Sequence, residues 1–494
     1  MTDLLSTVRG CTFDDFLFTP QYSVIERRDP AAIDLSCRLS EHLRLQRPIV
    51  SANMDTITRA DMAIAVAEEG GIGIIDRGFR SGDIGPQVRE VERVKRRQHG
   101  TIADPYTVAP DVSLREAADA MRTTGVGTLV VVDDARRVAG LLTARDLRFA
   151  DLDGRVADRM TSRPALVVSE GAIDAPGAEA LMRAHKIKKL PLVDAGGRLL
   201  GLVTAKDLLK QRQLPFATRD AQGRLRVGAA IGAKGDYLER AAELLGAGAD
   251  VIVIDIAHGH SAVMSRAVET FRARFGDVEL IAGNVATAEG VRFLVERGVN
   301  GVKVGIGPGG GCTTRLNTNF GVPQVEALVT CREAAGGRVP LIADGGVKRD
   351  GALAQALLFG GDTVMLGSVL AGTTETPGDA VQKTVVIPES HKAVKVPFKV
   401  FRGMASLQAI ADRLDLEDAE SSDVEALGAE GIEVSVPLRG SVRPVLRDML
   451  KHLCSAISYG GAGSLAELQE RFRADPDRYV IRLTESARRE SFDR

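Results

Sequence analysis

The sequence PLIADGGVKRDGALAQALLFGGDTVMLGS, residues 340–368, decides the fold. It opens with an apolar run, Pro340–Gly346, that ends in an aspartate and two glycines. Apolar residues at helical spacing follow in Lys348–Phe359, and a second apolar run, Thr363–Ser368, ends in a glycine and a serine. Strand, helix and strand in this order predict parallel pairing, with the polar residues at the carboxyl ends of the strands.

Six further runs of the same kind precede this stretch. They are Pro48–Asn53, Gly71–Asp76, Leu225–Gly232, Asp250–Ala257, Glu279–Ala286 and Gly301–Gly307. Helical spacing recurs between them, for example in Tyr237–Ala247 and Ala288–Arg297. Eight such units predict an α/β protein with a (β/α)8 TIM barrel, whose chemistry lies at the carboxyl ends of the strands. The competing fold is a doubly wound open sheet, but no Gly-x-Gly-x-x-Gly opens a helix after the first strand.

A repeated pattern fills the long gap between the second and third of these runs, which at about 150 residues is too long for one loop. Val112–Leu147 contains a helix-like stretch, an apolar run and a run ending Thr-Ala-Arg-Asp-Leu; Ala172–Leu208 repeats this order and ends Thr-Ala-Lys-Asp-Leu. The repeat resembles tandem cystathionine-β-synthase (CBS) modules, a Bateman domain. We therefore expect three segments: 1–95, the first part of the barrel; 96–213, a regulatory CBS pair (101–150 and 160–212); and 214–494, the rest of the barrel with a flap and tail.

The CBS resemblance implies that purine nucleotides such as ATP and GTP bind between the modules. In that family the Thr-x-x-Asp element caps the following helix, and its aspartate reaches a ribose. The matching residues are Thr143 with Asp146 and Thr204 with Asp207. The alternative is helix capping by these residues with no ligand.

Composition narrows the class of protein. Acids and bases are interspersed over 494 residues with a formal charge of −2, so we expect neither a nucleic-acid nor a membrane partner. We also expect no membrane span and no signal peptide. The five cysteines are scattered with no Cys-x-x-Cys pair, which argues against a disulfide framework or zinc site and favours a cytoplasmic location.

One cysteine stands apart from the others by its context. Cys312 ends the loop Gly305-Ile306-Gly307-Pro308-Gly309-Gly310-Gly311, and Thr313-Thr314-Arg315 follows. The glycines allow close approach of the backbone to a ligand, and the thiol at the end of the loop is placed to act as a nucleophile. A structural cysteine would more commonly lie inside an apolar run.

Ordered motifs accompany this loop along the chain. They are Cys11-Thr12-Phe13-Asp14-Asp15, Ala52-Asn53-Met54-Asp55-Thr56, Ala282-Gly283-Asn284-Val285-Ala286-Thr287, Ala343-Asp344-Gly345-Gly346, Leu366-Gly367-Ser368 and Phe401-Arg402-Gly403-Met404. Together with the Cys312 loop and the inserted repeat, this set is similar to the IMP dehydrogenase/GMP reductase family over essentially the whole chain.

The resemblance implies a role for each matching residue. Cys312 would attack C2 of a bound purine nucleotide, GMP or IMP, while Thr314 and Glu430 handle protons. Asp255 and Asn284 would contact the cofactor, NADPH or alternatively NAD, and the carbonyls of Gly307, Gly309 and Cys312 correspond to a potassium site. The substrate-binding positions are Ser51, Met54, Gly310, Asp344, Gly345, Gly346, Met365, Gly367, Ser368, Phe401, Gly403 and Met404.

Plainer interpretations of the same residues stay open. The glycines after the seventh and eighth strands expose backbone N–H groups suited to a 5′-phosphate, yet they also suit tight turns alone. Glu430 is equally consistent with a surface carboxylate. Asp255 is equally consistent with helix capping or with a buried hydrogen bond.

The choice between the two reactions of the family depends on a flap. Dehydrogenases of the family use an Arg-Tyr pair to activate water, and that pair is missing between Met404 and Glu430. Asp412-Arg413 lies about four residues early and is followed by leucine, while acids occupy the expected position. Asn53 also resembles the reductase branch, whereas Arg402 and the CBS pair are more typical of dehydrogenases.

These features favour reductive deamination of GMP to IMP and ammonia. IMP dehydrogenase is the first alternative, with Arg413 as the suspected water activator; an inactive nucleotide sensor and a flavin-dependent barrel enzyme are further alternatives. The family implies homo-oligomers, tetramers or octamers. Three departures from its pattern, Gly310 for serine, Gly311 for an apolar residue and Phe401 for tyrosine, predict weaker phosphate binding.

Overall fold

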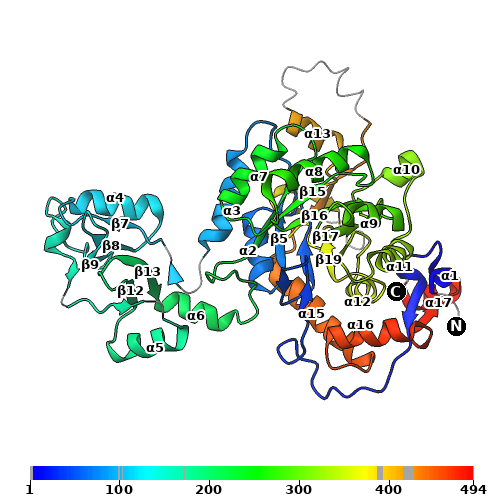
Figure 1. Ribbon diagram of the computed structural model, residues 1–494, viewed down its shortest axis with the longest axis horizontal. Helices are drawn as coiled ribbons and strands as arrows, with labels where there is room; N and C mark the ends of the chain where they lie inside the picture. Colours follow the sequence, from blue (N-terminus) through cyan, green and yellow to red (C-terminus); the bar gives the residue numbers. More distant parts are fainter. Residues whose placement is uncertain are drawn as a thin grey trace. The chain divides into compact units, whose positions relative to one another are not determined.

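The computed structural model describes residues 4–97, 101–102, 104–163, 165–171, 173–386, 393–414 and 428–492. The chain divides into two compact units (Figure 1). The first comprises Met1–Arg96, Phe216–Thr218 and Leu225–Arg494, and the second Arg97–Pro215 and Arg219–Arg224. Within the described ranges no helix is long and apolar enough to cross a membrane.

The first unit is built on a closed parallel barrel, as the sequence predicts. Its strands pair in the order β14-β15-β16-β17-β18-β19-β4-β5. Their bounds are β4 Ile49–Ser51, β5 Ile72–Ile75, β14 Val227–Ile231, β15 Val251–Asp255, β16 Leu280–Val285, β17 Gly301–Val304, β18 Leu341–Asp344 and β19 Thr363–Leu366. Each strand is buried almost throughout, which explains why the strands are continuous apolar runs rather than alternating ones. Each strand ends one to three residues before the end of its predicted run, so most of the Gly-rich motif residues lie in loops, while Asp255 and Asp344 are the last residues of β15 and β18.

Helices surround this barrel (Figure 1). They are α2 Ala60–Glu68, α3 Gly85–Arg96, α7 Tyr237–Gly246, α8 Ala262–Phe275, α9 Ala288–Val295, α11 Gln324–Ala335 and α12 Asp350–Leu358. Side chains at their N-caps fix several starts; Ser261 accepts from Met264 N and Thr287 from Gly290 N. Alternation of strand and helix therefore places every strand-to-helix loop at one face of the barrel.

The two ends of the chain add a layer to the same unit. The elements are α1 Leu4–Val8, η1 Phe13–Asp15, β1 Phe16–Phe18, β2 Cys37–Arg38, β3 Arg44–Leu45, α15 Val442–Tyr459, α16 Leu465–Ala474, η4 Pro476–Arg478, β23 Val480–Arg482 and α17 Glu485–Phe492. β1 pairs antiparallel with β23. Phe16, Phe359 and Phe472 pack together across these segments, with ring centroids 5.2 Å apart for the first two and 5.7 Å apart for the last two.

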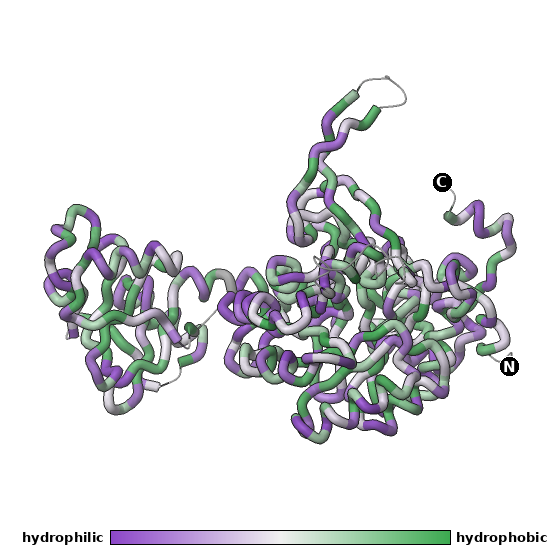
Figure 2. The backbone as a smooth tube through the Cα atoms, turned by 90° about the horizontal axis from the view of Figure 1, so that it is seen from above, coloured by the Kyte–Doolittle hydropathy of each residue, from purple (hydrophilic) through white to green (hydrophobic). Residues whose placement is uncertain are grey.

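An antiparallel sheet leads back to the open face of the barrel. β21, Ala393–Arg402, pairs with both β20, Val381–Val386, and β22, Glu433–Pro437. Figure 2 shows β20 and the start of β21 as an arm that projects from the unit, and the side chains of β20 are mostly exposed. At its other end β21 runs into Phe401 and Arg402, and α13, Leu407–Leu414, follows.

The second unit contains two four-stranded sheets, β10-β9-β8-β7 and β11-β12-β13-β6. The bounds are β6 Thr101–Ile102, β7 Thr107–Val108, α4 Leu114–Thr124, β8 Thr128–Val132, β9 Val138–Thr143, η2 Val156–Asp158, β10 Thr161–Ser162, β11 Ser169–Glu170, α5 Ala175–Ala184, β12 Lys189–Val193, β13 Leu199–Thr204 and α6 Ala205–Gln213. β6 pairs with β13 and β10 with β9. Each sheet thus takes one edge strand from the other sequence repeat, a feature that the repeat alone does not reveal.

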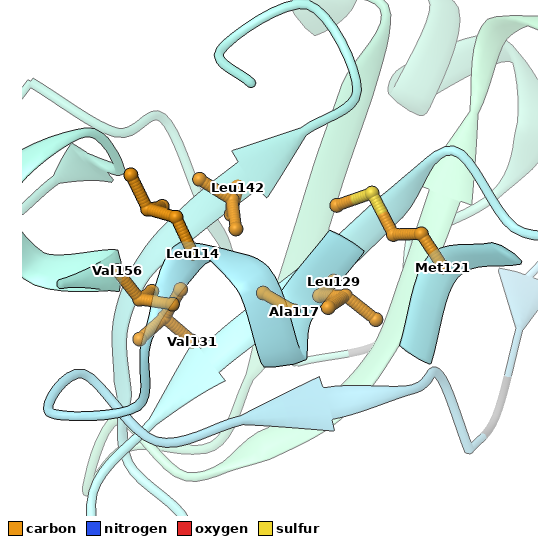
Figure 3. Packing of buried hydrophobic residues seen from close by; sticks show 7 residues of the cluster. All are labelled: Leu114, Ala117, Met121, Leu129, Val131, Leu142 and Val156. Atoms are coloured by element: carbon orange, nitrogen blue, oxygen red, sulfur yellow. The ribbon is translucent and has the colours of Figure 1, made fainter. Parts of the chain in front are cut away.

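A small apolar core holds the first of these sheets to its helix. Figure 3 shows Leu114, Ala117 and Met121 of α4 over the sheet residues Leu129, Val131 and Leu142, with Val156 at the edge of the cluster. Ser113 caps α4: its hydroxyl accepts from Glu116 N, and the Glu116 carboxylate accepts from Ser113 N at 3.2 Å.

The expected helix caps of this unit differ between the repeats. Asp207 N donates to Thr204 Oγ1 at 3.2 Å, and α6 follows. The expectation is wrong for Thr143, because residues 144–149 form turns rather than a helix. Both the N–H and the hydroxyl of Thr143 donate to Asp146 at 2.7 Å and close a turn. Phe149 then adopts a left-handed φ of 60°, which stops a helix.

Candidate active site

A cavity opens where the barrel strands end. Almost all the predicted catalytic, substrate and cofactor positions line it, and so do Gly307 and Gly309. Ser51 is the exception: as the last residue of β4 it is fully buried, and it is absent from the lining. The substrate contact predicted for Ser51 stays a prediction that the cavity lining does not support, because the side chain is fully buried.

A short hydrogen-bond relay joins the three predicted catalytic residues. The Cys312 thiol donates to Thr314 Oγ1 at 3.2 Å, and this hydroxyl donates to Glu430 Oε2 at 2.5 Å. Thr314 is the first residue of α10, Thr314–Thr318. The alternative that Glu430 is a detached surface carboxylate is wrong in this structure, because Glu430 ends the relay that begins at the thiol.

Backbone pairing brings these distant segments together. Thr313 N donates to Glu430 O at 2.8 Å, and Ile432 N donates to Gly311 O at 3.0 Å. Gly403 N donates in turn to Ile432 O at 3.0 Å. A Cβ on Gly311 would lie 3.0 Å from Gly403 N, so the two backbones pack closely here and a side chain would require a small shift.

The Cys312 loop also meets the glycines of the seventh and eighth units. Gly345 has φ +91°, and a Cβ there would lie 3.0 Å from Gly309 N. A Cβ on Gly310 would lie 3.6 Å from Ser368 Cβ. Loops after β17, β18 and β19 therefore converge beside the cavity, at the end of a barrel where phosphate sites commonly lie.

A buried lysine organises the centre of the cavity. Lys303 Nζ contacts Asp255 Oδ1 at 2.8 Å and Asp344 Oδ2 at 2.7 Å, and its side chain is 3% exposed. Lys303 also donates to the amide oxygen of Asn284. Asn284 Nδ2 donates to Gly305 O at 2.6 Å and to Asp344 Oδ2 at 2.9 Å. Asn284 therefore orients Asp344 and the Cys312 loop in addition to lining the cavity.

These charges set one another's ionisation. Burial alone would lower the pKa of Lys303, but Asp255 and Asp344 outweigh it and raise that pKa above its ordinary value. Burial alone would raise the pKa of Asp255, yet Lys303 and Arg77 hold it below its usual range. Both aspartates are thus held close to a permanent cation, and Asp255 remains an ionised acceptor for a ligand hydroxyl.

Arg402 fastens α13 beside the cavity. Its Nη2 donates to Asp55 Oδ2 at 2.6 Å and to Asp412 Oδ2 at 2.7 Å. Arg413, which follows Asp412 in α13, lines the cavity, and its Nη1 donates to Met404 O at 2.9 Å. The position expected for an Arg-Tyr pair, near Glu417, lies outside the described residues.

Two functional residues were missed by the sequence reasoning. Lys303 lies inside the apolar run Gly301–Val304, and a lysine in a buried strand needs carboxylate partners, which is a signal that the sequence carries. Arg77 follows β5 and lines the cavity, with Nε 3.7 Å from Asp255 Oδ2. No local pattern marks Arg77, because only barrel closure brings β5 close to β15.

Comparison with known proteins agrees with this geometry. A family model described as the IMP dehydrogenase/GMP reductase domain matches residues 10–493. The chain belongs to the IMP dehydrogenase/GMP reductase family. Among curated relatives, the inosine-5′-monophosphate dehydrogenase of Aquifex aeolicus is 43% identical over 98% of this chain and 94% of its own length. That of Nitrosopumilus maritimus is 42% identical over 93% and 94%.

Solved structures point to the other branch of the family. The chain is similar to a cysteine-to-alanine variant of GMP reductase from Trypanosoma brucei in complex with guanosine 5′-monophosphate, with a TM-score of 0.85 and 38% identity over 99% of each chain. The same enzyme in complex with guanosine 5′-triphosphate gives a TM-score of 0.76 and 36% identity over 96% of this chain and 98% of that one. The protein is thus an oxidoreductase of a nicotinamide-dependent family that acts on purine nucleotides.

Proposed function

We propose that the protein is a GMP reductase, which converts GMP, NADPH and protons into IMP, ammonium and NADP⁺. The observation that carries the proposal is the continuous relay from the Cys312 thiol through Thr314 to Glu430. The high similarity to a GMP reductase with bound GMP supports the substrate assignment. The absence of an Arg-Tyr pair from residues 405–430 supports reduction over hydrolysis.

The relay supports a specific order of proton movements. The Cys312 thiol passes its proton through Thr314 to Glu430, and the sulfur attacks C2 of GMP. Glu430 returns the proton through Thr314 to the 2-amino group, the C2–N bond breaks and ammonia leaves. A thioimidate on Cys312 remains. NADPH, when bound, supplies a hydride to C2, and the sulfur leaves as a thiolate to release IMP.

The remaining residues position the reactants in this proposal. Backbone amides of Gly345, Gly346, Gly367 and Ser368 receive the 5′-phosphate, and Asp344 accepts from the ribose of the nucleotide. Asp255 and Arg77 supply an acceptor and a donor suited to the cofactor. Asp255 is an ionised acceptor for its ribose, and Arg77 Nε is a buried donor that no acceptor within the described residues satisfies. A potassium ion at the carbonyls of Gly307, Gly309 and Cys312 is part of the same proposal.

IMP dehydrogenase is the second candidate, because the curated relatives quoted above carry that name and Arg413 lines the cavity. Two mixtures separate the reactions: GMP with NADPH, and IMP with NAD and potassium, each followed by the absorbance of the reduced nicotinamide. Loss of absorbance with GMP, together with ammonium release, is the expected result. A gain with IMP and NAD would assign the dehydrogenase reaction instead. No change of absorbance in either mixture would favour the nucleotide sensor, and a yellow purified protein would favour a flavin enzyme.

The second unit supplies the proposed regulation. We place purine effectors such as ATP and GTP at Thr143 with Asp146 and at Thr204 with Asp207, and the similar GMP reductase with bound guanosine triphosphate is consistent with a guanine effector. Effector binding would shift the population of assemblies, tetramers and octamers, of a cytoplasmic enzyme. A variant without residues 96–213 should lose every purine effect while it retains GMP turnover.

A further inference from the structure

Two arginines of the cavity have no carboxylate within hydrogen-bonding distance among the described residues. Arg77 follows β5, and its Nε lies 3.7 Å from Asp255 Oδ2, beyond hydrogen-bonding distance. This Nε is buried, and within the described ranges no hydrogen-bond acceptor reaches it. Arg413 on α13 donates to the carbonyl oxygen of Met404, and no described carboxylate forms an ion pair with it.

Lys303 and Arg402, the neighbouring cations, differ from Arg77 and Arg413 because each lies between two carboxylates. Lys303 lies between Asp255 and Asp344, and Arg402 lies between Asp55 and Asp412. Burial, followed by the like charge of Arg77, lowers the pKa of Arg413 to about 10. Two guanidinium groups that repel each other in a half-buried cavity gain most from a bound anion that both can contact.

The position of this pair identifies the anion. In the ring of eight strands, β14 and β15 stand four places from β18 and β19, and β5 is the other neighbour of β14. The glycine loops proposed for the nucleotide phosphate follow β18 and β19. Arg77 follows β5 and Asp255 ends β15, so their strands stand across the ring from β18 and β19, and the proposed function assigns the cofactor to this side.

We propose that Arg77 and Arg413 bind the diphosphate bridge of the nicotinamide dinucleotide, while Asp255 accepts from a hydroxyl of the adjoining ribose. The contact between Arg77 and Asp255 fits this arrangement, since the bridge is attached to the same ribose. Planar guanidinium groups match paired phosphate oxygens better than a lysine does. The inference rests on the cofactor class of the proposed function, and it holds for NADPH and NAD alike because both contain the bridge.

Binding without turnover tests the assignment. The chain contains no tryptophan, so the fluorescence of a reduced nicotinamide can be followed in the absence of GMP with little interference. Arg77→Gln and Arg413→Gln should each weaken NADPH binding about tenfold or more. Neither should change the affinity for reduced nicotinamide riboside, which has the ring and ribose but no phosphate, by more than about threefold. Arg77→Lys should fall between wild type and Arg77→Gln.

Matched variants exclude indirect effects. Arg338→Gln removes an exposed arginine remote from the cavity and should leave both affinities unchanged. Asp255→Asn should weaken the riboside and NADPH alike, because it acts on the ribose that they share. GMP affinity, measured calorimetrically in each variant, should stay within about twofold of wild type if the fold and phosphate site are intact.

Three results would overturn the assignment. Equal losses for NADPH and the riboside in Arg77→Gln would show that Arg77 acts through Asp255. Unchanged NADPH affinity in both glutamine variants would remove the diphosphate site. Unchanged NADPH affinity in Arg413→Gln, with loss of XMP formation from IMP, would make Arg413 a water-activating residue. If turnover assays instead reveal a dehydrogenase, the same titrations with NADH still test the inference. Failure of the reductase proposal is therefore distinguishable from failure of the diphosphate site.

Discussion

The Thr314 hydroxyl donates to Glu430 at 2.5 Å, although 116 residues separate the two in the chain. The backbone bond from Thr313 N to Glu430 O fixes this approach, and the thiol of Cys312 completes the relay. A hydroxyl with one donor and one acceptor partner is suited to pass a proton between them.

Removal of the relay should slow deamination without loss of substrate binding. Thr314→Val and Glu430→Gln each break the path for the proton, and we expect kcat for GMP to fall by about 10²- to 10⁴-fold. Thr314→Ser keeps the hydroxyl and should retain most activity. Steady-state kinetics with GMP and NADPH measure this. A Thr314→Val enzyme with near wild-type kcat would exclude the relay from the rate-limiting chemistry.

Cys312→Ala should abolish turnover and preserve nucleotide binding, because the proposed function assigns the phosphate to backbone amides and not to the thiol. Titration calorimetry with GMP should give an affinity within about threefold of wild type. Mass spectrometry after mixing wild type with GMP should detect a covalent adduct that the variant lacks. Residual steady-state reduction by Cys312→Ala would contradict covalent catalysis.

Lys303→Met should destabilise the barrel unit, since it removes the cation between Asp255 and Asp344 and leaves Asp255 with only the more distant Arg77, 3.7 Å away. Removal of one member of a buried ion pair costs about 3–5 kcal/mol in the free energy of unfolding. Denaturant unfolding followed by circular dichroism measures the loss. Combination with Asp255→Asn and Asp344→Asn should recover part of it, and an unaltered midpoint for Lys303→Met alone would show that the charges are compensated by other means.

The fully buried Asp76 should make stability depend on pH. Burial raises its pKa to about 6, even though Arg59 opposes the shift. The folded state therefore keeps a proton that the unfolded chain has already lost between about pH 4 and pH 6. This group's contribution to the free energy of unfolding should fall by about 3 kcal/mol as pH rises through that window, and should be flat above it.

Asp76→Asn lacks this titration, so the difference in unfolding free energy between wild type and variant should shrink or change sign from pH 7 to pH 4. The amide oxygen of the substituted side chain can still accept the bond from Gly78 N that Asp76 Oδ1 accepts at 2.6 Å. Parallel pH dependence of the two proteins across the window would contradict the assignment.

The second unit offers a test of nucleotide binding. Asp207→Ala and Asp146→Ala each remove a carboxylate that the proposal directs to a ribose, so each should weaken ATP or GTP binding about tenfold in calorimetry. Asp158→Ala removes an exposed carboxylate of the same unit as a matched control. Equal affinities in all three variants would favour plain turn and helix capping by Asp146 and Asp207.

Local sequence predicted all eight barrel strands, because a strand buried on both faces must be a continuous apolar run. It also predicted most of the cavity lining, since barrel topology gathers the carboxyl ends of the strands. Ser51 lies apart from the rest of the predicted lining because it is the last residue of β4 and is buried, whereas Ala52, in the loop beyond the strand, lines the cavity. The edge strands β6 and β10 could not be assigned, because two residues carry no periodicity that identifies a partner sheet.

By itself the sequence determined the eight βα units and the inserted repeat, and it singled out the Cys312 thiol as the candidate nucleophile; each of these depends on residues close together in the chain. Only the tertiary structure decided which charges meet. Lys303 reaches Asp255 and Asp344, Arg402 reaches Asp55 and Asp412, and Arg77 and Arg413 line the same cavity. These partners lie on separate strands and loops, and the strength of a charge interaction depends on distance and burial, which barrel closure alone fixes.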